Sequence, residues 1–136
     1  AAVEAAAGKR DHVDVVGTDH PTPDGSCVRD YVHVSDLADA HVKALERLIA
    51  RPNENLLLNC GYGKGLSVLE VLDALDRVLG RPIRREIKGR RPGDSPQLVA
   101  ANRALVETLD WSPRFADIDT NVAHALSWER QLLQSA

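Results

Sequence analysis

Length, composition and charge place the chain among small globular domains and exclude several classes of function. Its 136 residues suffice for one domain that buries about two-thirds of its unfolded surface. The formal net charge of -3 gives no electrostatic case for binding nucleic acid. No apolar run approaches the roughly 20 residues that cross a bilayer. Cys27 and Cys60 are isolated and lack metal-ligand spacing, which favours a reduced, cytoplasmic setting, with a disulfide between them as the alternative.

The first residues predict the end of a helix rather than a secretion signal. An alanine-rich run that includes Glu4 is closed by Gly8, which is typical of a helix C-terminus. The run has no apolar secretion core. The chain contains no Met, and together with a start inside a helix this predicts a piece of a longer protein.

The next elements are a strand, a loop, a helix and a second strand. Residues 12–16 predict the strand, and residues 17–27, rich in Asp, Thr, Pro and Gly, predict the loop. Ser35 is the predicted N-cap of a helix over about residues 36–50. Residues 55–59 are a compact apolar strand that leads into a glycine loop.

The second half begins with a helix signature. Ser67 and Glu70 predict a capping box, and Gly80 closes the apolar stripe that follows. Trp111 and Trp128 are predicted core residues. The remaining elements are a strand, a short helix and a final helix, at residues 82–88, 102–110 and about 117–134. Strands that alternate with helices predict an α/β domain, and strands this few predict part of a larger fold.

The glycine loop "GYGKG" follows a strand and precedes a capped helix, the setting of a phosphate-binding turn. It lacks the third glycine at the dinucleotide spacing, and no acidic residue ends a second strand about 20 positions later. It also departs from the P-loop pattern, because Lys64 is followed by Gly65. We therefore interpret it as a tight turn that borders a ligand.

Arginines are the candidate anion-binding groups. Arg91 lies on a Pro-Gly turn from which a guanidinium can fork onto phosphate oxygens, and Asp94 can accept from sugar hydroxyls. The alternative is that Arg90 and Arg91 are simply solvated. Arg29 either pairs with Asp30 or converges with Arg91 on a diphosphate. The histidines and cysteines are assigned to packing or surface positions, and no Ser-His-Asp or metal set is assembled.

The motifs together are more specific than any one of them. "DVVGTDHPTPDGSCVRDYVHVSDLADAH", "LNCGYGKGLSVLEVLDAL", "RRPGDSPQLVA" and "LDWSPRF", before a helix containing "ALSWERQ", resemble the UDP-glucose 4-epimerases in order and spacing. The likeness is to the C-terminal part of these extended short-chain dehydrogenases. It implies a fold in which an N-terminal Rossmann domain, missing here, holds NAD. It also implies that residues 1–136 form the UDP-sugar-binding segment.

The resemblance assigns the groups that contact the diphosphate and ribose. Arg29 of "VRDY" matches the arginine on the diphosphate, and Tyr31 belongs to the same binding segment. Arg91 of "RPGD" matches its partner, with Asp94 on the ribose.

The resemblance also assigns the uracil and sugar ends. Asp14, Val15 and Val16 match the segment whose backbone addresses uracil, although that segment commonly ends in Phe. Leu98 stands where the family sets the size of the sugar pocket, and a medium side chain there favours hexoses over N-acetyl sugars.

The catalytic parts of the family are absent from this sequence. The NAD fingerprint is missing, and the Tyr-x-x-x-Lys pair that generates a catalytic base is not formed, since Ser35 follows Tyr31 by four and Leu66 follows Tyr62 by four. The resemblance therefore implies a chain with no catalytic, NAD-binding or metal residues that is inactive alone. The alternatives are another nucleotide-sugar epimerase or dehydratase, or a truncated, non-catalytic UDP-binding module.

A missing domain would leave apolar surface without cover. We expect Val13, Val15 and residues 56–58 to be exposed in the isolated chain. The expected partners are a Rossmann domain, a partner chain or a second copy in a homo-oligomer.

Overall fold

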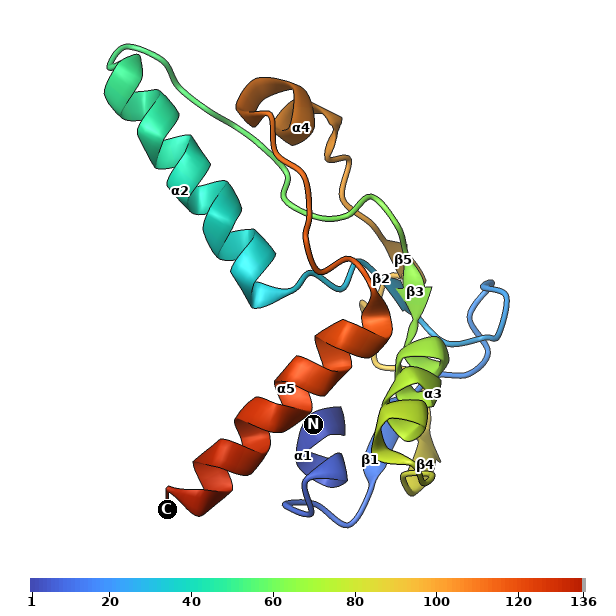
Figure 1. The fold of residues 1–136 in the computed structure, drawn as a ribbon. Coiled ribbons are helices and arrows are strands. Elements are labelled where there is room, and N and C mark those ends of the chain that lie inside the picture. Colours follow the sequence, from blue (N-terminus) through green and yellow to red (C-terminus); the bar gives the residue numbers. More distant parts are fainter. Residues whose placement is uncertain (136) are drawn as a thin grey trace.

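The computed structural model describes residues 1–135 and alternates helices with short strands (Figure 1). The elements in chain order are α1 (Ala2–Ala6), β1 (Val13–Val16), β2 (Val28–Arg29), α2 (Val34–Ala50), β3 (Leu66–Ser67), α3 (Val68–Leu79), β4 (Arg85–Lys88), β5 (Gln97–Leu98), α4 (Arg103–Leu109) and α5 (Ile118–Gln134). None of these helices combines the length and apolarity that crossing a membrane requires.

The strands form two small sheets instead of one large one. β1 pairs in parallel with β4, with Val13 opposite Arg85. β2 lies between β3, to which it is antiparallel, and β5, to which it is parallel. In the described residues the strands are therefore as few and as scattered as the sequence predicts.

The sheet lobe, which comprises α1, β1, α3, β4 and α5, contains the larger apolar core. Val15 of β1 packs against Leu72 and Leu75 of α3 and Val122 of α5, and all four side chains are buried. The expectation that Val13 and Val15 are exposed is wrong, because α3 and α5 cover β1 within this chain.

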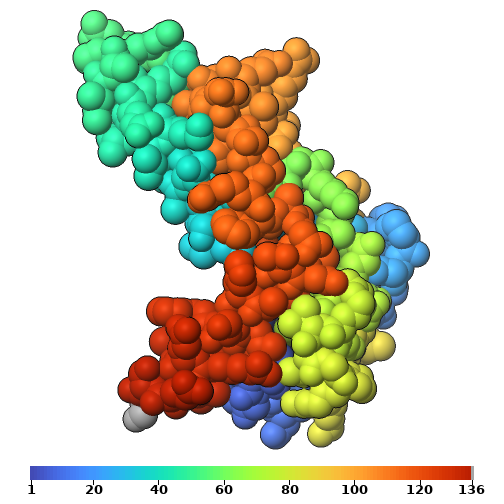
Figure 2. Space-filling model, in the orientation of Figure 1, coloured from blue at the N-terminus to red at the C-terminus, as the bar shows by residue number. Residues whose placement is uncertain are grey.

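The helical lobe, which comprises α2, α4 and residues 51–62, packs around Trp111. That indole is 1% exposed and contacts a cluster that includes Ala40 and Leu105. Arg47 of α2 ties the lobe together by bonding the Glu54 carboxylate and the Thr108 carbonyl. In the space-filling view a notch separates this lobe from α5 of the sheet lobe (Figure 2).

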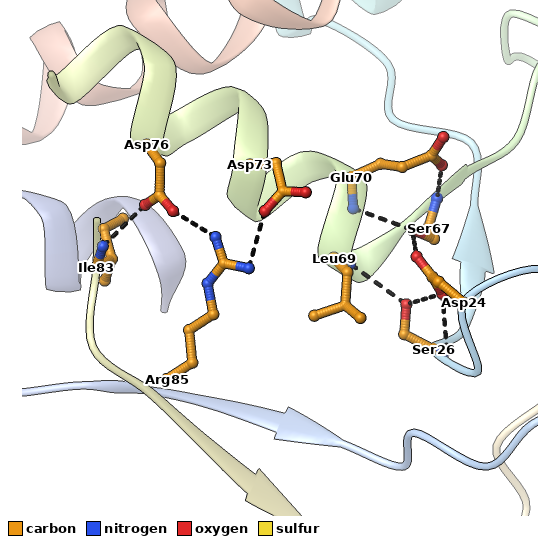
Figure 3. A network of polar contacts seen from close by, with 9 residues as sticks. All are labelled: Asp24, Ser26, Ser67, Leu69, Glu70, Asp73, Asp76, Ile83 and Arg85. Carbon is orange, nitrogen blue, oxygen red and sulfur yellow. Dashed lines mark hydrogen bonds and ion pairs between the residues drawn. The ribbon is translucent and has the colours of Figure 1, made fainter. Parts of the chain in front are cut away.

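The first turn of α3 is held by the predicted capping box and by an additional acid (Figure 3). Ser67 Oγ accepts the Glu70 N–H at 3.0 Å, and the Glu70 carboxylate accepts the Ser67 N–H at 2.7 Å. The Asp24 carboxylate accepts from the Ser67 hydroxyl and, at 2.8 Å, from the Ser26 hydroxyl. The network fixes the loop before β2 against α3. Gly80 ends the helix in the left-handed conformation, as predicted.

The predicted start of α2 is wrong by two residues. His33, not Ser35, is the N-cap, because its imidazole Nδ1 accepts the Ser35 N–H at 3.0 Å. The ring is buried and also bonds His124 of α5 through Nε2 at 3.0 Å. An imidazole in the capping position supplies the acceptor that a hydroxyl normally provides.

Two predicted strands differ from those in the structure. Residues 55–59 belong to no strand, because the described part of the chain offers them no pairing partner. The strand predicted over residues 82–88 covers only Arg85–Lys88, and β5 at Gln97–Leu98 was not predicted. The prediction for Trp128 is also wrong, since its side chain is 61% exposed.

Replacing the α3 cap tests how much this network stabilises the fold. We expect Ser67→Ala to lower the free energy of unfolding by about 1 to 2 kcal/mol, because the hydroxyl loses its hydrogen bonds with the Glu70 N–H and the Asp24 carboxylate. Urea unfolding followed by circular dichroism measures the change. Ser112→Ala, at an exposed serine, is the control and should be nearly neutral. A change of less than about 0.3 kcal/mol in Ser67→Ala would contradict the assigned role.

Candidate functional site

Arg29 and Leu98 face each other across the ladder of β2 and β5. Their Cα atoms are register partners, and both side chains line an open cavity of about 610 Å³ together with residues 58–60 and 99–101. Arg29 Nη1 donates to the Val28 carbonyl at 2.8 Å, which holds the guanidinium at the cavity wall. The structure thus brings together the predicted diphosphate arginine and the predicted sugar-pocket residue.

Asp30 does not serve as the ion-pair partner of Arg29 that was one alternative. Its carboxylate accepts three backbone N–H groups, from Tyr62 at 2.9 Å, Gly63 at 3.0 Å and Ala100 at 3.2 Å. Within the described residues, the other N–H donors of the Arg29 guanidinium have no hydrogen-bond partner, so they are available to a ligand.

The glycine loop is a close-packed turn in which two backbone donors are already used. Two of its N–H groups bind Asp30 and are not available to a phosphate. A Cβ on Gly61 would lie 2.5 Å from the Asp30 carboxylate, and a Cβ on Gly65 would lie 2.4 Å from Val28. The glycines are therefore required by packing, which agrees with the interpretation of a tight turn beside the cavity.

Arg91 lies at a second cavity of about 510 Å³, which Asp14 and Val16 also line. Its side chain is 71% exposed and its Nε lies 3.2 Å from the Asp94 carboxylate. The neighbouring Arg90 is occupied by Asp19 at 2.6 Å. The structure groups Arg91, Asp94, Asp14 and Val16 and places Arg29 and Leu98 in the other cavity. Convergence of both arginines on one diphosphate stays a prediction.

Val15 and Tyr31 occupy different environments. Val15 is 1% exposed, so only its backbone is available to a ligand, as the resemblance implies. Tyr31 lines a third, smaller cavity of about 220 Å³ with Tyr62 and Lys64. Burial raises the pKa of the Tyr31 phenol, and the charge of Arg29 opposes that rise.

Sequence reasoning missed a histidine–carboxylate cluster on the β1–β4 sheet. His12 Nε2 lies 3.3 Å from Asp14 and 3.5 Å from Glu86, and their ligand atoms lie close enough for one metal ion. Lys88 already neutralises this face, 2.9 Å from Glu86 and 3.7 Å from Asp14. We interpret the cluster as an ion-pair network. The i, i+2 spacing of His12 and Asp14 was visible, but their cross-strand partner was not.

Sequence reasoning also missed the buried carboxylate of Asp36. Its side chain is 1% exposed and accepts the Tyr62 hydroxyl at 2.6 Å and the backbone N–H groups of Arg114 and Phe115 at 3.0 and 2.9 Å. Burial opposes ionisation, but these hydrogen bonds hold the pKa of Asp36 below its usual 3.8. Burial and the bond to Asp36 raise the pKa of Tyr62 to about 12.

Acid should remove the stabilisation that Asp36 provides. Because its folded-state pKa is depressed, the contribution is present above pH 3.8 and is lost as the pH falls through the folded value. We expect Asp36→Asn to cost about 2 to 4 kcal/mol at pH 7, since a charge-assisted acceptor of three donors is lost.

Urea unfolding of wild type and variant from pH 7 down to pH 3 measures the pH dependence. The difference between them should shrink as the pH falls below 3.8. Asp11→Asn, at an exposed aspartate, is the control and should leave the pH dependence unchanged. A difference that grows in acid would contradict the assignment.

Comparison with known proteins identifies relatives for nearly the whole chain. Residues 1–61 match the model of the NAD dependent epimerase/dehydratase family. A UDP-glucose 4-epimerase of Azospirillum brasilense is 52% identical over 134 residues, which cover 98% of this chain and 38% of that enzyme. The chain therefore spans about 38% of the length of the curated relatives that it matches.

Solved structures share the fold. A UDP-glucose-4-epimerase from Stenotrophomonas maltophila, with bound NAD and formylated UDP-arabinopyranose, superposes with a TM-score of 0.92 at 36% identity. It covers 98% of this chain, which corresponds to 39% of that structure. The enzyme from Bifidobacterium longum, in complex with NAD+ and UDP, gives a TM-score of 0.87 at 36% identity over 99% of this chain and 39% of its own. These matches confirm the resemblance and the partial α/β fold.

Proposed function

We propose that the chain is the UDP-sugar-binding part of a UDP-glucose 4-epimerase. The carrying observation is the identity of 52% to such an enzyme over 98% of the chain. The whole enzyme would interconvert UDP-glucose and UDP-galactose through a 4-keto intermediate.

Recognition of the nucleotide sugar would rest on cationic and backbone groups. Arg29 presents free guanidinium donors from the wall of its cavity, and Arg91 reaches from the loop after β4. A guanidinium forks onto phosphate oxygens, so two of them match a diphosphate. Asp94 would meet the ribose, and the backbone of Asp14, Val15 and Val16 would meet uracil.

We do not expect this chain alone to bind NAD. The glycine loop commits two N–H groups to Asp30 and so cannot offer them to a dinucleotide pyrophosphate. NAD, which accepts and returns a hydride, would be held by the part of a full-length enzyme outside this chain. The catalytic Tyr-x-x-x-Lys pair would come from that part as well.

Two exposed apolar surfaces are consistent with such a missing domain. Leu57 is 96% exposed and lies in residues 55–59, which pair with no strand of the described chain. Exposed and partly buried side chains alternate along this segment, as they do along an edge strand. Val42, Leu45 and Ile49 form an exposed stripe on α2. We propose that a Rossmann domain covers both surfaces, with a partner chain or a second copy as the alternatives. The two free cysteines suit a reducing cytoplasm.

A second candidate is another nucleotide-sugar epimerase of the same fold. The structural relative from Stenotrophomonas maltophila holds a formylated UDP-arabinopyranose, so this fold accommodates sugars other than hexoses. Leu98, at 65% exposure, leaves the sugar end of the cavity open to either class. A panel of UDP-sugars offered to the full-length enzyme separates the two candidates.

UDP binding to the isolated chain tests the proposed function. Arg29→Ala and Arg91→Ala should each weaken binding about tenfold or more, because each removes a charge-assisted contact. Isothermal titration calorimetry measures the affinity. Arg103→Ala is the control, since Arg103 is exposed, pairs with Glu107 on α4 and does not line either arginine cavity.

The same preparation supplied with NAD and UDP-glucose should show no epimerisation. Turnover would contradict the assignment of catalysis to the missing part. Saturable UDP binding without turnover in any form of the protein would favour the non-catalytic module.

Self-association tests the exposed segment of residues 55–59. Leu57→Lys should reduce the association of the isolated chain without lowering its melting temperature, because the side chain makes almost no contacts within the chain. Sedimentation velocity at several concentrations measures the association. Ile87→Lys, at another exposed apolar side chain, is the control. A wild-type chain that remains monomeric at all concentrations would speak against this surface as an interface.

A further inference from the structure

Asp30 joins the three chain segments that form the cavity of Arg29 and Leu98. The first segment is the end of β2, which Asp30 directly follows. The second is residues 58–60, which lead directly into the Tyr62 and Gly63 N–H groups that bind the carboxylate. The third is residues 98–101, in which the Ala100 N–H binds it. One carboxylate therefore fixes the three walls relative to one another.

The chain is shaped to accommodate this carboxylate. The hypothetical Cβ of Gly61 would lie 2.5 Å from both Asp30 Oδ2 and the Ala100 side chain, so only glycine leaves the space. Asn102 Nδ2 donates to the Gly61 carbonyl at 2.8 Å and holds the loop from the other side. Gly61 and Asp30 thus form one interlocking contact at the back of the cavity.

We propose that Asp30 is a positioning residue for the nucleotide sugar, which sets Arg29 and residues 98–101 at the distance that the ligand requires. This inference rests on the proposed function. Asp30 itself lines the cavity, but its carboxylate and a diphosphate are both anionic acceptors, so Asp30 acts through the walls and not by bonding the diphosphate.

Charge and positioning predict opposite effects for Asp30→Asn. Removal of a negative charge next to the binding site of a dianion would strengthen UDP binding by Coulomb's law. Loss of the three hydrogen bonds to Asp30 would weaken UDP binding. An amide cannot accept from all three donors, because its own NH2 group must face at least one of them. The sign of the change therefore separates a positioning role from an electrostatic one.

A second carboxylate controls for stability. Asp36 also accepts three hydrogen bonds, and none of its three donor residues lines the Arg29 cavity. Asp36 is fully buried whereas Asp30 is partly buried, and the two share Tyr62 through its hydroxyl and its N–H. Asp36→Asn should destabilise the fold to a similar extent and leave UDP affinity within about twofold of wild type, whereas Asp30→Asn should weaken it about tenfold or more. Affinities are measured by calorimetry at a temperature where circular dichroism shows every variant folded.

A second variant disturbs the same contact without changing Asp30. Gly61→Ala places a methyl group against the carboxylate and should also weaken UDP binding about tenfold. Gly89→Ala is its control, because a Cβ at Gly89 meets nothing within 4 Å. If Asp30→Asn does not fold, Gly61→Ala decides the question.

The outcomes are distinguishable. Wild-type chain that does not bind UDP overturns the proposed function, and the inference with it. Wild-type chain that binds UDP, with Asp30→Asn or Gly61→Ala binding as tightly or more tightly, leaves the proposed function intact and overturns the positioning role. Equal losses in Asp30→Asn and Asp36→Asn would show a general effect of stability and would also overturn it.

Discussion

Buried backbone N–H groups need acceptors, and this constraint governs how the chain holds its loops. Strands of two to four residues satisfy only a small part of the backbone. Between the helices, carboxylates accept several backbone N–H groups that no strand pairs. Asp30 accepts from the glycine loop and from the segment after β5, and Asp36 accepts from the segment before α5. Both stand within one stretch of seven residues, between β2 and the first turn of α2.

The position of these carboxylates explains how two lobes become one body. Each lobe has its own apolar cluster, around Val15 and around Trp111. Tyr62 links the networks at the boundary, because its N–H binds Asp30 while its hydroxyl binds Asp36 and accepts the His33 N–H. The contact of His33 with His124 of α5 adds a second link between the lobes. The cavity of Arg29 and Leu98 therefore borders a part of the chain that several side-chain hydrogen bonds cross-link.

Local elements could be predicted from the sequence, and long-range pairing could not. The capping box at Ser67 and the C-cap at Gly80 follow from residues within a few positions, so their prediction is confirmed. The strand predicted over residues 55–59 has the right pattern but no partner in the described chain, and no single sequence reveals a missing neighbour. The predicted start of α2 is wrong because histidine is not a usual N-cap. The His33 ring accepts the Ser35 N–H in an orientation that its hydrogen bond to His124 helps to fix, and that long-range contact is not visible in the sequence. Motif resemblance gave the candidate site residues, but their grouping into cavities depends on β-strand register.

The two arginines assigned to the diphosphate are not equally prepared for it. Arg29 is held at the cavity wall by its own chain through the Val28 carbonyl, so its binding needs little reorganisation. Arg91 must first release Asp94, whose carboxylate lies 3.2 Å from Arg91 Nε at the surface. Surface ion pairs of this kind contribute only about 0 to 1 kcal/mol to stability. The cost of freeing Arg91 is therefore small beside the gain from a charge-assisted bond to phosphate, which is about 1.5 to 3 kcal/mol. Release of Asp94 would also free its carboxylate to accept from a ribose hydroxyl. Opening of the one Arg91–Asp94 pair would thus supply both a second guanidinium for the diphosphate and an acceptor for a ribose hydroxyl. Arg29 would keep its position at the cavity wall.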